Sequence, residues 1–148
     1  MAKSLSKDQA EFLKGRFQKW ESAQSDAVEL RSKLLVIGGL EIVAPPNNFE
    51  PDITLLLQAG AEQTGERRLI RMEDNSCHQN AAQLYLQANR PGFGIGTGYA
   101  LDGGLWRQHS WAVDAEVIVE TTVEAERYFG IVLYGDDAKR FCEMVNLN

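Results

Sequence analysis

The sequence has few cysteines and no long apolar run. These two absences argue against a disulfide-rich protein and against a membrane-spanning protein. Cys77 and Cys142 lie in unlike surroundings, so no disulfide framework is predicted and a reducing compartment is the simpler expectation. The best apolar stretch, residues 34–44, is interrupted by glycines and Glu41 and is too short to span a bilayer. The first eight residues lack the apolar core of a secretion signal. We therefore expect a cytoplasmic protein with no membrane partner.

Positive charge is scarce as well. The chain has 15 Lys and Arg against 21 Asp and Glu, and the formal net charge of -6 repels phosphate backbones. We therefore expect no nucleic-acid partner. A length of 148 residues with 44% hydrophobic residues is typical of one domain with a real core. We predict a single domain over residues 1–148, with an N-terminal helical segment at 1–36 and a catalytic core at 75–133.

Histidine occurs only twice, which limits metal chemistry. His78 adjoins Cys77, but neighbouring helical residues point roughly 100° apart, so the two side chains cannot easily share one ion. No other pair of candidate ligands has the usual metal-site spacing. We expect neither a metal nor a cofactor.

Helical periodicity dominates the N-terminal part. Ser6 and Gln9 have the spacing of a capping box, and apolar residues from Phe12 to Leu34 then recur at helical intervals. This pattern predicts a long helix, broken once, that packs its apolar side into the core; homodimerisation through a leftover apolar stripe is the alternative. Residues 38–71 give a weak signal, in which 53–57 fit either a strand or a helical turn and 68–72 fit a short strand.

A second helix is predicted to begin at Cys77. N-cap residues occupy 74–76, apolar positions follow at helical spacing, and residues 89–92 end the pattern. The period then changes to two, and residues 95–101, 105–113, 116–121 and 127–133 are strand-like with short connections. Short connections favour an antiparallel meander, and Asp136–Asp137 then cap a C-terminal helix. The fold class is therefore α+β, with the N-terminal helices packed on a meander sheet.

The predicted elements offer one residue for each role in cysteine catalysis. Such catalysis needs a thiolate, an imidazole to hold its proton and a polar group that orients the imidazole. Cys77 lies where the helix dipole and free backbone N–H groups stabilise a thiolate. If residues 114–115 form a two-residue turn, or 113–116 a four-residue turn, His109 faces Glu120 across neighbouring strands. A bulge or a three-residue loop would break this register.

These motifs resemble the papain-like cysteine hydrolase superfamily, and its transglutaminase-like branch most closely. The resemblance rests on a cysteine that opens a helix, on His109 followed two residues later by Trp111, and on Glu120 followed two residues later by Thr122. It covers residues 75–133. It implies a helix packed on an antiparallel sheet, a Cys77–His109–Glu120 triad and thiol-dependent acyl chemistry on amides or esters.

The surroundings of this triad are less well determined. Asn75 and Gln79 are candidates for the second oxyanion donor, with Gln63 a further one if its loop folds back. Alternating glycines, including Gly96 and Gly98, bare one side of a strand, which either lets a helix pack closely or walls a substrate groove. Trp111 shares the side of His109 and is either core or a substrate platform, whereas Trp106 points the opposite way.

The predicted activity is that of a cysteine-dependent hydrolase or acyltransferase that acts on a small-molecule or peptide substrate through an amide or ester bond. Two alternatives stay open at this point: an inactive binding or interaction module of the same fold, and a structural protein in which the three residues coincide by chance. A uniquely reactive thiol would distinguish the enzyme from both.

Overall fold

The N-terminal segment folds as two helices because its helical pattern is interrupted once. In the computed structural model, which describes residues 4–145, α1 (Lys7–Ala23) begins at the predicted capping box. Ser6 Oγ accepts the Gln9 N–H at 3.1 Å, and Gln9 Oε1 accepts the Ser6 N–H at 3.0 Å. After a short turn the chain continues as α2 (Ala27–Ile37). The predicted break is therefore confirmed.

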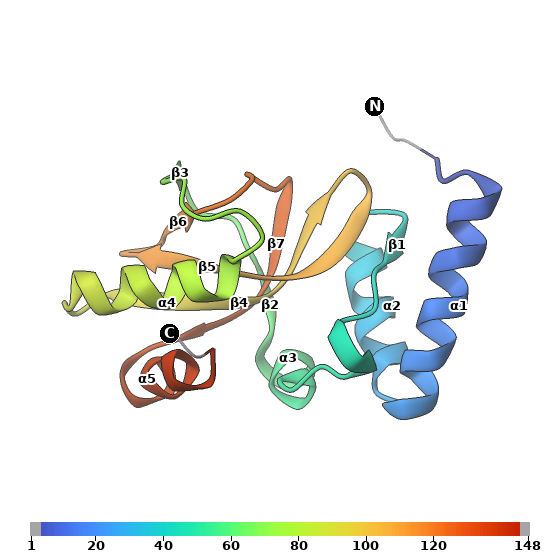
Figure 1. Cartoon of the computed structure of the whole chain (residues 1–148), viewed down its shortest axis with the longest axis horizontal. Helices are drawn as coiled ribbons and strands as arrows, with labels where there is room; N and C mark the ends of the chain where they lie inside the picture. The colour runs from blue at the N-terminus through green and yellow to red at the C-terminus, as the bar shows by residue number, and fades with distance from the viewer. Residues whose placement is uncertain (1–3, 146–148) are drawn as a thin grey trace.

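Three further helices and a seven-stranded sheet complete the α+β fold (Figure 1). The helices are α3 (Ile53–Ala59), α4 (Cys77–Ala88) and α5 (Gly135–Met144), with a short 3-10 helix η1 (Pro46–Asn48). The strands are β1 (Glu41–Ile42), β2 (Ala61–Gln63), β3 (Arg67–Leu69), β4 (Phe93–Asp102), β5 (Leu105–Asp114), β6 (Val117–Glu120) and β7 (Arg127–Leu133). Residues 53–57, which the pattern left open, are helical. Among residues 4–145, no helix is both long enough and apolar enough to cross a membrane.

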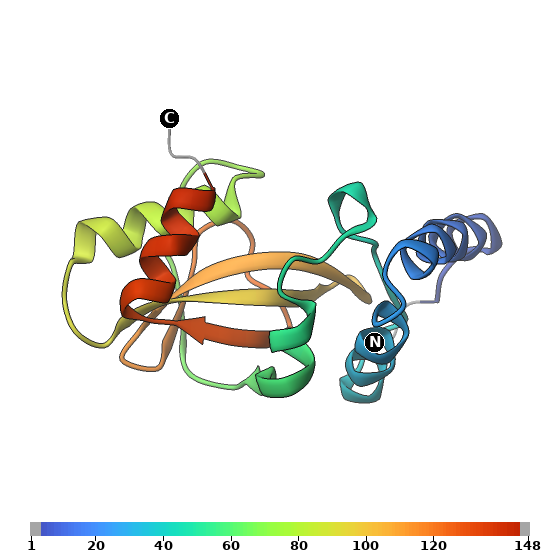
Figure 2. The same cartoon turned by 90° about the horizontal axis from the view of Figure 1, so that it is seen from below.

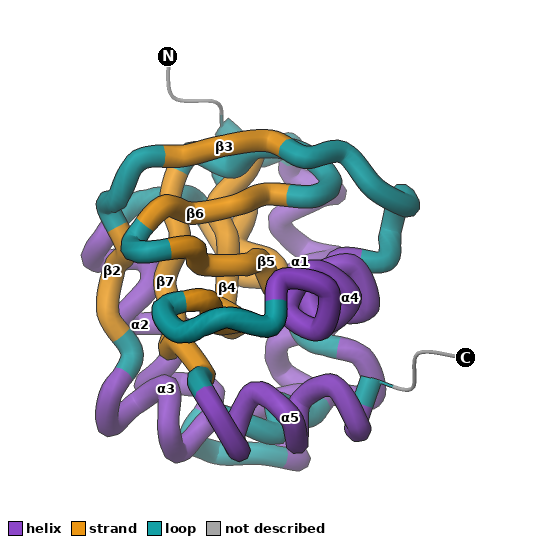
Figure 3. The backbone as a smooth tube through the Cα atoms, turned by 90° about the vertical axis from the view of Figure 1, so that its left-hand side faces the viewer, coloured by secondary structure: helices purple, strands orange, loops and turns teal. Residues whose placement is uncertain are grey.

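The sheet order is β2-β7-β4-β5-β6-β3, with β1 paired in parallel to β5. The prediction of a simple meander is correct for β4, β5 and β6 but wrong for β7, which returns to pair with β4. Where the chain leaves β6, the backbone N–H groups of Thr121 and Thr122 bind the Glu120 carboxylate and not a neighbouring strand. Strand β7 packs tightly on β4 because Gly98 faces Gly130; a Cβ on Gly130 would lie 2.2 Å from the Thr97 carbonyl oxygen. The resulting sheet is strongly curled (Figure 3).

The two sides of the sheet have separate cores. Helices α4 and α5 lie together at one end of the sheet, and α1 and α2 lie at the other end (Figure 2). Trp106 packs with Leu30 and Leu34 of α2, whereas Trp111 packs with Tyr128 inside the curl. Both tryptophans are fully buried. The predicted opposite orientation of Trp106 and Trp111 is therefore confirmed.

The register of β5 on β6 differs by two residues from the predicted one. Val113 pairs with Ile118 and Asp114 with Val117, so the turn consists of Ala115 and Glu116 and not of residues 114–115. Both turn residues have positive φ, 48° and 75°, as in the two-residue turns whose twist matches that of the strands. Because the shift is even, side-chain alternation still places Glu120 on the same side of the sheet as His109.

Candidate active site

An interruption in the sheet exposes the middle of β5. Strand β4 occupies one side of β5 along its whole length, while the other side pairs with β1 at residues 105–106 and with β6 at residues 112–114. Among the described residues, no strand pairs with 107–111 on that side. A cleft of about 540 Å³ lies there, which we call the thiol cleft. Its lining includes Asn75, Cys77, Arg107, Gln108, His109 and Thr122.

Cys77 is the first residue of α4, as predicted, and is half-buried at the thiol cleft. The backbone N–H groups in the first turn of a helix lack intrahelical partners and stabilise nearby negative charge. Cys142 has a different environment: it is buried in α5, its Sγ lies 3.8 Å from the Ala82 carbonyl oxygen, and burial raises the pKa of its thiol. The two thiols therefore differ in access and in electrostatic surroundings.

His109 lies between Cys77 and Glu120. Its Nε2 is 2.7 Å from Glu120 Oε1, so Nδ1 is the ring nitrogen that Glu120 leaves free. Burial alone would lower the pKa of His109, but hydrogen bonding and electrostatic interaction with Cys77 and Glu120 raise it to about 9. The side chain is 14% exposed, and its ring stacks on Trp111 at a centroid distance of 6.0 Å. The arrangement favours an imidazolium that contacts both partners.

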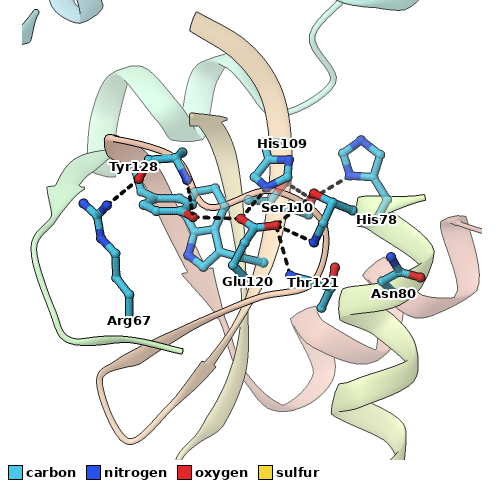
Figure 4. A network of polar contacts seen from close by, with 12 residues as sticks. Arg67, His78, Asn80, His109, Ser110, Glu120, Thr121 and Tyr128 are labelled. Carbon is cyan, nitrogen blue, oxygen red and sulfur yellow. Dashed lines mark hydrogen bonds and ion pairs between the residues drawn. The ribbon is translucent and has the colours of Figure 1, made fainter. Parts of the chain in front are cut away.

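Glu120 is fully buried and accepts five hydrogen bonds (Figure 4). Oε1 accepts from His109 at 2.7 Å and from the Tyr128 hydroxyl at 2.8 Å. Oε2 accepts the N–H groups of Thr121 and Thr122 at 3.0 and 2.9 Å, and the Thr122 hydroxyl at 2.9 Å. Burial would raise the pKa of Glu120, but the His109 contact and these donors lower it to about 2. The carboxylate is therefore charged and fixed in position.

Tyr128 also binds the Glu120 carboxylate, and its role in the site was not predicted from the sequence. Its hydroxyl accepts the Ala125 N–H at 3.2 Å while donating to Glu120, and burial raises its pKa, so it stays a donor. Arg67 lies 5.1 Å from the ring centroid and donates to the carbonyl oxygens of Ala125 and Glu126. Side-chain alternation along β7 could have indicated that Tyr128 faces Glu120, but only if the pairing of β7 with β4 had been known.

The predicted substrate-groove residues lie inside the core instead. Trp111 is fully buried, and its indole N–H donates to Gln63 Oε1 at 3.0 Å. Gly96 faces Trp111 across the strands, and a Cβ there would lie 2.0 Å from the indole nitrogen. A Cβ on Gly98 would lie 2.2 Å from the Phe129 carbonyl oxygen. The glycines therefore make room for an indole ring and a neighbouring strand, not for a substrate.

The candidate oxyanion donors separate into two groups. Asn75 lines the thiol cleft and has a left-handed backbone with φ of 59°. Gln79 is directed elsewhere, because its amide lies 3.4 Å from the Val145 carbonyl oxygen. Gln63 binds Trp111, as described above. Gln108, which the sequence analysis did not single out, also lines the cleft. The structure thus keeps Asn75 beside Cys77 and places Gln79 away from it.

His78 belongs to a separate polar chain next to the thiol. Its Nδ1 lies 2.6 Å from Ser110 Oγ, which lies 3.0 Å from Thr97 Oγ1. Burial and the positive charge of His109 lower the pKa of His78, against a hydrogen bond with Gln108 that raises it. His78 is therefore neutral beside a charged His109. Within residues 4–145, no three His, Cys, Asp or Glu side chains are grouped so that they could hold a metal ion.

Comparison with protein-family models, curated proteins and solved structures gives no match for this chain. The function is therefore argued from the geometry and chemistry of the site.

Proposed function

We propose that this protein is a cysteine-dependent hydrolase or acyltransferase with Cys77 as nucleophile, His109 as general base and acid, and Glu120 as the residue that orients the imidazole. The observation that carries the proposal is the position of His109, which lines the thiol cleft together with Cys77 and holds its Nε2 2.7 Å from the fixed Glu120 carboxylate. An imidazole held in this way has its proton-accepting nitrogen directed at the nucleophile.

The reaction follows from these positions. In the resting site His109 already holds the proton that Cys77 gives up, as an imidazolium beside a thiolate, and the Cys77 sulfur attacks the carbonyl carbon of an amide or ester, giving a tetrahedral oxyanion. His109 returns the proton to the leaving amine or alcohol as the carbon–heteroatom bond breaks, leaving an acyl-thioester on Cys77. Water or an amine, deprotonated by His109, then attacks the thioester and regenerates the thiol. The free N–H groups that begin α4 and the Asn75 side chain are the groups nearest in sequence for binding the oxyanion.

The contacts of two neighbouring residues support the likeness to papain-like enzymes of the transglutaminase-like branch. Trp111, two residues after His109, stacks against the imidazole. Thr122, two residues after Glu120, donates its hydroxyl to the Glu120 carboxylate. Each residue that carries the resemblance in sequence therefore holds a member of the proposed triad, and we propose a papain-like origin for the arrangement of α4 on the sheet.

The proposal is tested by measuring which thiol reacts. Iodoacetamide labelling from pH 5 to 9, with peptide mass spectrometry to assign sites, compares Cys77 with Cys142 as the internal reference. Cys77 should label much faster than Cys142 below pH 7, because an unperturbed thiol, with a pKa of about 8.5, is almost fully protonated there. His109→Ala should abolish the advantage. His78→Ala serves as the matched control, since it removes the other histidine beside Cys77.

Two results would contradict the proposal. In one, Cys77 labels only when the protein unfolds, as expected for a buried apolar side chain. In the other, His109→Ala and His78→Ala affect labelling equally, which would remove the specific role of His109. Either result would favour the binding-module or structural alternative.

A further inference from the structure

A second pocket adjoins the thiol cleft on the other side of Gln108. Its volume is about 470 Å³, and we call it the acidic pocket. Its polar lining includes Glu50, Asp52, His78 and Gln108, and its apolar lining includes Leu55, Leu133, Phe141 and Met144. Gln108 lines both spaces, and the consecutive residues Cys77 and His78 line one each. The two spaces therefore meet at Gln108 and at the start of α4.

Glu50 is a buried carboxylate held in this pocket by neutral donors. It is 3% exposed. Oε1 accepts from the Tyr99 hydroxyl at 2.9 Å and from Gln108 Nε2 at 2.7 Å, and Oε2 accepts the Asp52 N–H at 2.9 Å. Its backbone is fixed as well, because its N–H and carbonyl oxygen both bind the Gln24 amide at the end of α1. The position of this carboxylate is therefore determined by three separate parts of the chain.

Glu50 and Asp52 have no counter-ion in the part of the chain that the structure describes. Among residues 4–145, no Lys or Arg forms an ion pair with Glu50 or Asp52. Arg140 also lines the pocket, but it pairs with Asp137. Burial raises the pKa of both Glu50 and Asp52, which is the signature of carboxylates that lack a compensating cation. A cationic group that enters the pocket would supply the missing positive charge.

We infer that the acidic pocket binds an aliphatic ammonium group of the substrate, such as a lysine side chain adjoining the carbonyl that Cys77 attacks. The methylene stem would lie against the apolar lining, and the ammonium would lie between Glu50 and Asp52. The Glu50 oxygens already accept three hydrogen bonds, so a guanidinium could form its planar fork only with Asp52, whereas a compact ammonium can lie between both carboxylates. The link to the scissile carbonyl rests on the proposed function; the binding of the ammonium does not.

Matched electrophiles test the inference. Three probes that alkylate a thiol are compared: Nα-chloroacetyl-lysine methylamide and its norleucine and arginine counterparts. The norleucine side chain has the length of the lysine stem but lacks the ammonium. The lysine probe should inactivate Cys77 about tenfold faster than the norleucine probe, the factor that a difference of 1.4 kcal/mol represents. Asp52→Asn should remove most of this preference while leaving the iodoacetamide rate unchanged. Glu11→Gln is the control, because it removes one exposed negative charge from α1, far from the pocket.

Asp52→Asn is the main variant because the Asp52 side chain accepts no hydrogen bond from residues 4–145, so its loss should leave the fold intact. Equal rates for the lysine and norleucine probes would overturn the inference, and so would a preference that survives both Asp52→Asn and Glu50→Gln. A faster arginine probe would overturn the choice of an ammonium.

A binding measurement separates this inference from the proposed function. Nα-acetyl-lysine methylamide, titrated into the Cys77→Ala variant and followed by NMR, should shift the signals of Gln108 and His78, whereas the norleucine analogue should not. Binding together with an unreactive Cys77 would leave the acidic pocket valid and refute the proposed function. A reactive Cys77 without binding would refute the acidic pocket alone.

Discussion

Glu120→Gln should favour the neutral form of His109 and place its one ring proton on Nδ1 and not on Nε2. The backbone N–H groups of Thr121 and Thr122 are fixed and require an acceptor, so the amide oxygen of Gln must face them. The amide NH₂ then points at His109 and Tyr128. Tyr128 can rotate its hydroxyl and accept, but His109 can accept at Nε2 only if its proton moves to Nδ1, the nitrogen on the Cys77 side. That nitrogen could no longer take the thiol proton.

The size of the effect follows from the charges in the site. A His109 pKa of about 9, against an ordinary 6.5, represents on the order of 3 kcal/mol in favour of the imidazolium, shared between Cys77 and Glu120. Removing the Glu120 charge should therefore cost part of this, on the order of 1–2 kcal/mol, which corresponds to a roughly tenfold lower Cys77 labelling rate at pH 6. Turnover should fall much further, because a reversed tautomer in a comparable triad costs about 10⁴.

Two measurements check this prediction. ¹⁵N NMR of the imidazole reports which nitrogen of His109 carries the proton, and iodoacetamide labelling reports the reactivity of Cys77. Glu124→Gln, an exposed residue close in sequence, is the control for loss of one negative charge. The melting temperature should change little, because the amide is nearly isosteric. If His109 keeps its Nε2 proton and Cys77 labels at the wild-type rate, Glu120 does not orient the base.

Three further predictions concern stability. The raised pKa of His109 stabilises the fold fully below about pH 6.5 and loses that effect as the pH rises through about 9. The free energy of unfolding in urea should therefore fall over this range, and a fall that persists unchanged in His109→Gln would contradict the assignment. Gly96→Ala should destabilise the fold by roughly 1–3 kcal/mol, because its Cβ would overlap Trp111. Gly15→Ala, on an open part of α1, should stabilise it by about 1 kcal/mol; thermal melts that place both variants on the same side of wild type would refute the packing argument.

The positions of Cys77, His109 and Glu120 could be predicted because each depends on short-range rules. A cluster of residue types that favour N-cap positions predicted where α4 begins, although the Ser76 side chain makes no capping hydrogen bond there, and side-chain alternation determines which side of the sheet a strand residue faces. The predicted register was wrong by two residues, because nothing in the sequence marks Ala115–Glu116 as a turn with positive φ. The predicted contact between His109 and Glu120 is nevertheless present, because a register shifted by two residues leaves each side chain on the same side of the sheet.

The surroundings of the site could not be predicted because they depend on contacts between distant segments. Tyr128 reaches Glu120 only because β7 passes beside β4, and period-two patterns do not reveal which strands are neighbours. Glu50 lies in a loop with weak periodicity, and its burial depends on Tyr99, Gln108 and Gln24. Gly96 was predicted to border helix or substrate, and the structure shows that it accommodates an indole from the neighbouring strand.

The chain order of the strands determines when the parts of the site meet during folding. Strands β4, β5 and β6 are joined by tight turns, so His109 and Glu120 approach each other through local hairpins whose closure costs little chain entropy. Gln63 and Tyr128 pair across a much longer loop, and their strands close the curl around Trp111. Local contacts form faster than distant ones. The acid–base pair should therefore assemble before the indole beneath it is enclosed, so disrupting the β2–β7 pairing should speed unfolding more than it slows folding.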